Sequence, residues 1–192
     1  MDFTSSPSRR KPITVAHASL QGAEVRLLRV DAHAEFGGFG RWLSQPGEWV
    51  GAFDFPFGLP RELVTSLGWP QEWLALMQHY AALPREHIRA TFRDWCAARP
   101  QGGKFAHRAT DLPAGSSPSM KWVNPPVAFM LHAGVPLLID AGVHMPGLRP
   151  VAHEARVALE GYPGLLAREL IGRRSYKSDA KAAQTPARRE AR

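Results

Sequence analysis

Cysteine is almost absent from this chain, and so are long apolar runs. Cys96 is the single cysteine among 192 residues, which excludes an intramolecular disulfide and any metal motif built on several cysteines. No apolar run approaches the roughly 18 residues of a membrane span. No apolar segment follows the first basic residues, as a secretory signal would require. We therefore expect a cytoplasmic protein without a membrane partner.

Several common catalytic and nucleotide-binding motifs are missing as well. Gly103-Lys104 is followed by Phe105 rather than Ser or Thr, so there is no Walker A loop. The chain has no His-Glu-x-x-His, Gly-x-Ser-x-Gly or Gly-x-Gly-x-x-Gly sequence. The eight histidines are scattered, and His107 alone falls in a candidate functional loop. Because these motifs are absent, carboxylates and basic residues remain as the candidate catalytic groups.

The composition is that of a folded domain with a basic end. Hydrophobic residues make up 44% of the chain, with six Trp and nine Phe, enough for a sizeable core in one domain. We place that domain at residues 1–179 and a basic tail, or the start of a helix, at 180–192. Of the net charge of +7, residues 168–192 hold eight basic side chains against three acids, so 8 − 3 = +5. Such a run favours a nucleic-acid partner or is simply a solvated helix face.

Apolar periodicity and turn residues predict a mixed α/β order. A hairpin is expected from strands at 12–20 and 23–30, because Gln21-Gly22 between them supplies a turn. The apolar run 49–53, without alternation, predicts a strand buried on both faces. A loop is expected at 100–121. The remaining expected elements are helices at 37–45, 61–82 with a break at 68–70, 84–99, 127–133 and 163–171, and strands at 135–140 and 156–160.

Two acids fall where apolar runs end, and a third lies in an Asp-Phe pair at the start of the chain. Asp54 follows the run 49–53 and precedes a Pro- and Gly-rich turn, Glu160 closes the run 156–160, and Asp2 opens the chain. Asp is also common at turns, where it caps the next helix. Ligands gather beyond the C-terminal ends of parallel strands, and clustered carboxylates require a proton or a cation between them. The pattern therefore indicates a Mg²⁺ or Mn²⁺ site on Asp2, Asp54 and Glu160, suited to phosphodiester hydrolysis.

Basic residues near these acids would stabilise the charge on a phosphate. Lys177 follows the helix that comes after Glu160 and is the best placed by sequence. Arg108, in the loop 100–121, is second.

The motifs together resemble a known family. Asp2-Phe3-Thr-Ser-Ser-Pro, Asp54-Phe-Pro-Phe-Gly-Leu-Pro60, His107-Arg-Ala-Thr-Asp111 and Glu160-Gly-Tyr-Pro, followed by Ser175-Tyr-Lys-Ser-Asp179, are similar to those of the predicted ribonuclease H-like nucleases. More narrowly, the chain resembles the bacterial domain-of-unknown-function family numbered four-two-nine, over nearly its whole length.

The resemblance implies a ribonuclease H-like fold, with three antiparallel strands, a helix, and then a strand parallel to the first. It also implies that Asp2 and Asp54 meet at neighbouring strand ends. By position, Asp2, Asp54 and Glu160 match the family's acids and Lys177 its lysine, while Arg108 and Asp111 match further site residues. The implied activity is that of a metal-dependent nuclease.

The ends of the chain depart from the family pattern. Family members have an apolar strand before the first Asp, whereas Met1 stands directly before Asp2. We expect either a fragment or a start codon assigned too far downstream. Three hypotheses follow: a metal-dependent nuclease, a nucleic-acid-binding module that has lost catalysis, and a hydrolase of a small phosphorylated metabolite.

Overall fold

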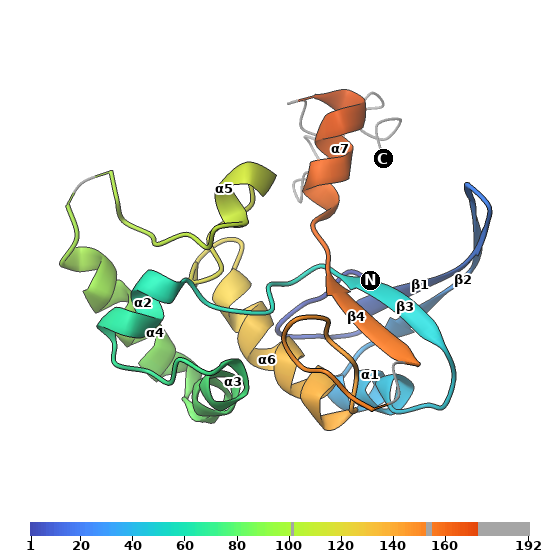
Figure 1. Cartoon of the computed structure of the whole chain (residues 1–192), viewed down its shortest axis with the longest axis horizontal. Helices are drawn as coiled ribbons and strands as arrows, with labels where there is room; N and C mark the ends of the chain where they lie inside the picture. The colour runs from blue at the N-terminus through green and yellow to red at the C-terminus, as the bar shows by residue number, and fades with distance from the viewer. Residues whose placement is uncertain (101, 153–154, 173–192) are drawn as a thin grey trace.

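The computed structural model describes residues 1–100, 102–152 and 155–172, and its elements follow the predicted mixed α/β order. The predicted hairpin is confirmed: β1 (Ile13–Gln21) pairs antiparallel with β2 (Glu24–His33), and Gly22 turns the chain at φ 60°. α1 (Phe36–Leu43) and β3 (Trp49–Phe53) come next. β4 (Arg156–Glu160) pairs with β3 in parallel, with Phe53 opposite Glu160. The molecule thus combines an antiparallel pair, a parallel pair and helices (Figure 1).

The first two residues lie between the two strand pairs and connect them. Asp2 and Thr14 exchange backbone hydrogen bonds, with N···O distances of 2.9 and 3.0 Å in an antiparallel bridge. On the other side, the Met1 amino group donates to the Ala52 carbonyl at 2.7 Å, and the Asp54 N–H donates to the Met1 carbonyl at 3.3 Å. Those two bonds are the pattern of a parallel bridge between Met1 and Phe53. Asp2 and Asp54 are therefore neighbours in register.

The helices lie to one side of the strands, with α6 in the middle of the molecule (Figure 1). α6 contacts both α1 and α3. α7 begins with Pro163, as predicted, and extends away from the strands (Figure 1). The bounds of the remaining helices are α2 (Arg61–Ser66), α3 (Trp73–Ala82), α4 (Arg85–Ala97), α5 (Asp111–Ala114), α6 (Val127–Asp140) and α7 (Pro163–Ile171). No helix in the described ranges is both long and apolar enough to cross a bilayer.

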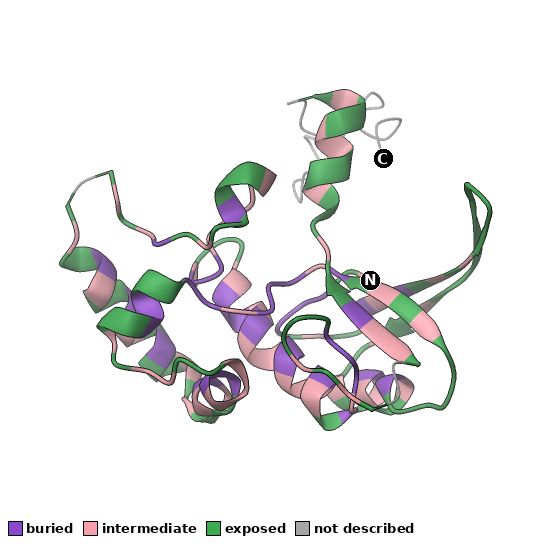
Figure 2. Ribbon diagram, in the orientation of Figure 1, coloured by how far each residue is buried: buried purple, intermediate pink, exposed green. Residues whose placement is uncertain are grey.

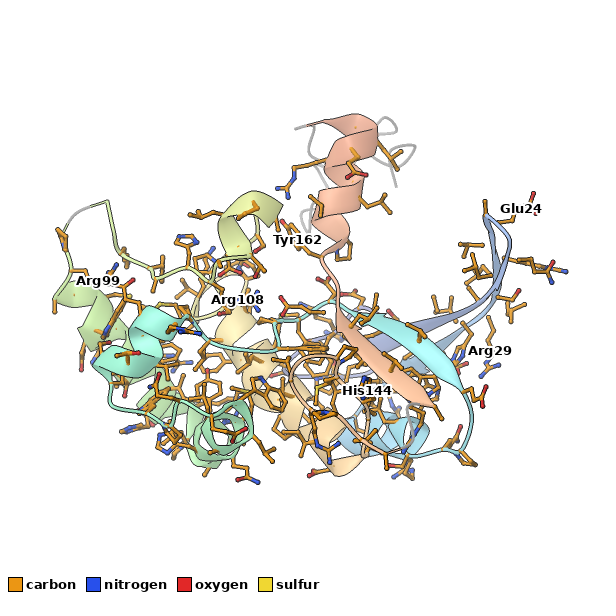
Figure 3. The ribbon with its side chains drawn as sticks, in the orientation of Figure 1. Glu24, Arg29, Arg99, Arg108, His144 and Tyr162 are labelled. Carbon is orange, nitrogen blue, oxygen red and sulfur yellow. The ribbon has the colours of Figure 1, made fainter. Side chains whose placement is uncertain are left out.

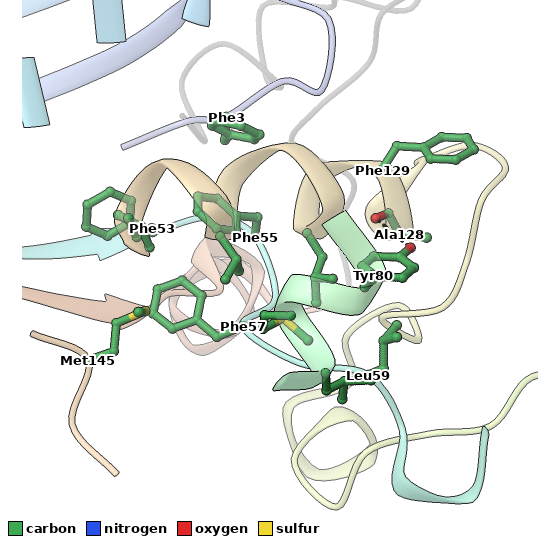
Figure 4. Close-up of a cluster of buried hydrophobic side chains, with 14 of the residues drawn as sticks. Phe3, Phe53, Phe55, Phe57, Leu59, Tyr80, Ala128, Phe129 and Met145 are labelled. Atoms are coloured by element: carbon green, nitrogen blue, oxygen red, sulfur yellow. Dashed lines mark hydrogen bonds between the residues drawn. The ribbon is translucent and has the colours of Figure 1, made fainter. Parts of the chain in front are cut away.

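Aromatic side chains fill the core between the strands and α6. Phe53, Phe55 and Phe57 succeed one another along the end of β3 and its turn, and all three are buried (Figures 2 and 4). Phe3 packs against Phe55 in a tilted arrangement, with ring centroids 4.7 Å apart. Because these rings come from the same short segments as Asp2 and Asp54, core packing fixes the backbone that carries the two acids.

Two predictions about individual elements are wrong. The strand expected at 135–140 is the second half of α6, which runs unbroken through Pro136. Short apolar runs do not distinguish a buried helix from a strand by periodicity. In the structure Leu131, Val135 and Leu138 are buried at helical spacing on α6, which contacts α1 and α3. β3 is also not buried on both faces: Val50 is 71% exposed, whereas Phe53 is buried. Within the loop predicted at 100–121, residues 111–114 form the short helix α5.

Candidate functional site

Acidic and basic side chains meet in a cavity at the C-terminal ends of β3 and β4. Asp54 directly follows β3, Glu160 is the last residue of β4, and Asp2 belongs to the segment beside β3. These three acids and Arg108 line a cavity of about 860 Å³. Four of the residues that the sequence selected for chemistry are thus brought together from four separate segments.

Arg108 forms a two-point ion pair with the carboxylate of Glu160 through both terminal nitrogens of its guanidinium group. Nη1 donates to Glu160 Oε2 at 2.7 Å, and Nη2 donates to Oε1 at 2.6 Å. The Arg108 side chain is 17% exposed and that of Glu160 34%. A parallel two-point pair of this kind fixes both groups in orientation as well as in distance. Figure 3 shows Arg108 between the helices and the strand end.

Asp111 lies behind Arg108 and does not line the cavity. Its side chain is fully buried and accepts hydrogen bonds from Arg108 Nε at 3.0 Å and Nη2 at 2.8 Å. It also accepts from the Arg108 backbone N–H at 2.9 Å and from Ser116 Oγ at 3.3 Å. Asp111 is therefore a positioning residue that holds Arg108 toward the cavity. The sequence signal for this pair was the His107-Arg-Ala-Thr-Asp111 motif.

The charge of Arg108 is secured by its two partners. Burial alone would lower the pKa of this guanidinium group, but hydrogen bonds and attraction from Glu160 and Asp111 raise it above its ordinary value. The group is cationic at any pH at which the protein folds.

Glu160 also binds the turn that follows β3. Its Oε2 accepts a hydrogen bond from the Phe57 backbone N–H at 2.9 Å. Both carboxylate oxygens are therefore already bonded within the protein. Glu160 joins the end of β4 to the turn after β3 and orients Arg108 at the same time.

Asp2 and Asp54 are the acids best suited to hold a cation. Oxygen donors of this type are what Mg²⁺ and Mn²⁺ prefer. The Met1 amino group is close to both: burial lowers its pKa, while Asp54 and Asp2 act in the opposite direction. Within residues 1–100, 102–152 and 155–172, no three His, Cys, Asp or Glu side chains are grouped closely enough to enclose a metal ion. The donors present fit a site completed by water and phosphate oxygens rather than an all-protein cage.

The far wall of the cavity is made by α5 and α7, which are bonded to each other. Tyr162 Oη donates to the Gly115 carbonyl at 3.3 Å, and Arg168 Nη1 donates to the same carbonyl at 3.0 Å. Tyr162, labelled in Figure 3, also lines the cavity, and so does Lys11. Sequence reasoning missed Lys11 because nothing in its local sequence marks it. Tyr162 was visible only as part of the Glu-Gly-Tyr-Pro motif.

Two sequence-predicted features lie outside the described residues. Lys177, expected to stabilise a phosphate, is one of them, and the basic tail at 180–192 is the other. His107 is exposed and does not line the cavity. No family model, curated protein or solved structure matches the chain.

Proposed function

We propose that the protein is a metal-dependent phosphodiesterase, a nuclease of ribonuclease H type that cleaves nucleic acid. The observation that carries this proposal is the convergence of Asp2, Asp54, Glu160 and Arg108 on one cavity at the ends of parallel strands. Catalytic groups collect at that end of α/β sheets.

The order of the hydrogen-bonded segments supports the ribonuclease H-like fold. Across the strands it runs β2, β1, Met1–Asp2, β3, β4. β1 is antiparallel to the Met1–Asp2 segment, and the bonds of Met1 to Ala52 and Asp54 run in the parallel sense, as do those between β3 and β4. This is the arrangement that the sequence resemblance implies, with the first strand beside the strand that follows the helix.

The charge balance of the cavity supports a divalent cation as cofactor. Among the described residues, the lining holds three carboxylates and two cationic side chains, Lys11 and Arg108, and the Met1 amino group is close to Asp2 and Asp54, so 2 + 1 − 3 = 0. Asp111 adds a negative charge behind Arg108, which makes the balance negative. A phosphodiester is an anion and would be repelled by this balance unless a cation were bound as well. Asp2 and Asp54 would hold Mg²⁺ or Mn²⁺, which when bound supplies a polarised phosphate and a more acidic water.

Arg108 has one donor left for the substrate. Its Nε–H, both N–H groups of Nη2 and one N–H of Nη1 are used by Asp111 and Glu160. Among the described residues, the second N–H of Nη1 has no partner. We assign this N–H to a non-bridging oxygen of the scissile phosphate, where charge increases as water attacks phosphorus and the bond to the leaving oxygen breaks.

A small phosphate ester is a second candidate substrate. The cavity volume of about 860 Å³ lies within the range of pockets that enclose small ligands. The wall formed by α5 and α7 also limits access from one side. A hydrolase of a phosphorylated metabolite would use the same acids and the same arginine.

Hydrolysis assays distinguish these possibilities. Labelled single- and double-stranded oligonucleotides and bis-p-nitrophenyl phosphate are incubated with Mg²⁺ or Mn²⁺. We expect oligonucleotide cleavage that requires the metal and falls by about 100-fold or more in Asp54→Asn. Asp94→Asn is the matched control, because Asp94 is 68% exposed on α4 and pairs only with its neighbour Arg93.

Each hypothesis predicts a different result in these hydrolysis assays. Hydrolysis of the small ester alone would replace the nuclease with the metabolite hydrolase. Cleavage at the wild-type rate in Asp54→Asn, or cleavage in the presence of a chelator, would contradict the proposed site. Metal-free binding of oligonucleotides without any hydrolysis would favour the catalytically inactive binding module.

A further inference from the structure

Five cationic side chains lie beside the cavity and form what we term the basic rim: Arg9, Arg10, Lys11, Arg85 and Arg89. Lys11 lines the cavity itself. Arg9 and Arg10 are the exposed corner residues of a turn in which Ser8 and Lys11 exchange two backbone hydrogen bonds of 3.1 Å. The turn therefore fixes three successive cations at the cavity edge.

The other two cations of the basic rim come from α4, which is attached to the same segment. The Arg85 guanidinium donates to the Ser5 carbonyl and, at 3.2 Å, to Ser6 Oγ. Arg85 and Arg89 both stand over the Phe129 ring, at 5.4 and 5.6 Å from its centroid. Ser5, which accepts a hydrogen bond from Arg85, lines the cavity, whereas Phe129 does not. Arg85 thereby connects α4 to the edge of the cavity, and Arg89 lies over the same ring as Arg85.

None of the five rim cations has an acidic partner in the part of the chain that the structure describes. Elsewhere, five arginines are paired with a carboxylate within 4 Å: Arg29, Arg41, Arg93, Arg99 and Arg108. Unpaired like charges held together repel one another, and a bound polyanion removes that repulsion. The basic rim is thus a concentration of uncompensated positive charge that leads to an acidic cavity.

We infer that the basic rim binds the phosphate backbone of a nucleic-acid strand and leads one of its phosphodiesters into the cavity. This inference rests on the proposed function and makes the substrate a polynucleotide rather than a small ester. It also assigns nucleic-acid binding to residues 9–11 and α4, whereas the sequence had pointed to the C-terminal tail. Side-chain cations beside successive phosphates are the main source of non-specific affinity for nucleic acid.

Salt dependence of binding tests the inference without any need for catalysis. Binding of a labelled duplex to protein carrying Asp54→Asn is measured in a chelator at several salt concentrations. The rim variant adds Arg9→Gln, Arg10→Gln and Arg89→Gln, leaving Lys11 at the cavity and Arg85 with its bonds to Ser5 and Ser6 in place. The matched control removes the same charge from exposed cations away from the rim, with Arg26→Gln, Arg61→Gln and Lys104→Gln.

Each lost phosphate contact lowers the slope of log K against log salt by about 0.9 on duplex DNA. We expect the rim variant to lose about 2.7 of that slope and therefore to bind about 500-fold more weakly at 0.1 M salt. The control variant should keep the slope of the parent protein. Equal losses of slope in the two variants would mean that the rim acts only through the protein's overall charge, and this result would overturn the inference. An unchanged slope in the rim variant would overturn it as well.

Failure of the inference is distinguishable from failure of the proposed function. A rim-dependent slope together with no metal-dependent cleavage would leave the basic rim standing and remove the catalytic proposal. Normal cleavage with a slope that does not depend on the rim would do the reverse. Thermal denaturation followed by circular dichroism serves as the control for folding: if the rim and control variants unfold at the same Tm as the parent protein, the loss with duplex DNA is not a general loss of fold.

Discussion

Removing the carboxylate of Asp111 should destabilise the protein and release Arg108. In the folded state this buried side chain accepts three hydrogen bonds from Arg108 and one from Ser116. Asp111→Ala leaves the Arg108 backbone N–H without its acceptor and leaves the Ser116 hydroxyl only its weaker bond to the backbone carbonyl of residue 111. It also leaves the mostly buried guanidinium group with Glu160 as its single carboxylate partner.

The expected cost follows from these contacts. Removing one partner of a buried ion pair typically costs 3–5 kcal/mol. Because Arg108 keeps Glu160, we expect the lower end, about 3 kcal/mol of the free energy of unfolding. For a chain of this length each kcal/mol lowers Tm by about 2–4 °C, so Tm should fall by about 6–12 °C. Asp111→Asn keeps the shape and one acceptor oxygen, and about half of that loss is expected.

Thermal denaturation followed by circular dichroism measures the change, with urea unfolding as a second method. Asp94→Ala is the control, since an exposed ion pair such as Arg93–Asp94 contributes at most about 1 kcal/mol. A Tm of Asp111→Ala equal to that of Asp94→Ala would refute the reasoning, because Asp111 would then not be a buried anchor of Arg108.

Two further substitutions test packing and protonation. Gly134→Ala places a Cβ 2.7 Å from the Phe55 ring and should lower the free energy of unfolding by about 1–3 kcal/mol through overpacking. Gly40→Ala, whose Cβ would meet no atom nearer than 3.8 Å, should instead stabilise its helix by up to about 1 kcal/mol. Equal Tm values for the two variants would contradict the packing described. Burial lowers the pKa of His132, although its hydrogen bond to the Leu83 carbonyl opposes this shift. As the pH falls, the unfolded chain therefore binds a proton at this histidine before the folded protein does. The free energy of unfolding should fall as the pH drops below about 6.5. His132→Gln keeps a donor for that carbonyl, and the difference in Tm between pH 7.5 and 5.5 should be smaller than in wild type, whereas an unchanged difference would assign the titration to other groups.

Local sequence signals predicted most of the elements correctly. Gly22 marks the hairpin turn, Pro163 starts α7, and the apolar runs at 49–53 and 156–160 form the parallel pair. These signals work because each depends on a few neighbouring residues. The strand predicted at 135–140 was wrong because a short apolar run does not distinguish a helix from a strand, and this run packs as part of α6 against α1 and α3.

The residues of the candidate site could be predicted from the sequence, but the hydrogen bonds between them could not. The ends of apolar runs identified Asp54 and Glu160, and the Asp-Phe pair at the start of the chain added Asp2. No sequence pattern shows that Arg108 takes both oxygens of Glu160, which is 52 residues away. The basic rim was equally invisible, because it joins a turn near the start of the chain to α4 through the bonds of Arg85 to Ser5 and Ser6. Contacts of this kind depend on the completed fold.

Binding of Mn²⁺ followed by electron paramagnetic resonance decides whether Asp2 and Asp54 hold a divalent cation. Asp2→Asn and Asp54→Asn should each weaken Mn²⁺ binding by roughly tenfold or more, while Asp94→Asn should leave it unchanged. Glu160→Gln is expected to keep most of the affinity, because both oxygens of Glu160 are already bonded to Arg108 and Phe57. Mn²⁺ affinity that survives in both Asp2→Asn and Asp54→Asn, or that disappears only in Glu160→Gln, would contradict the site described for this protein.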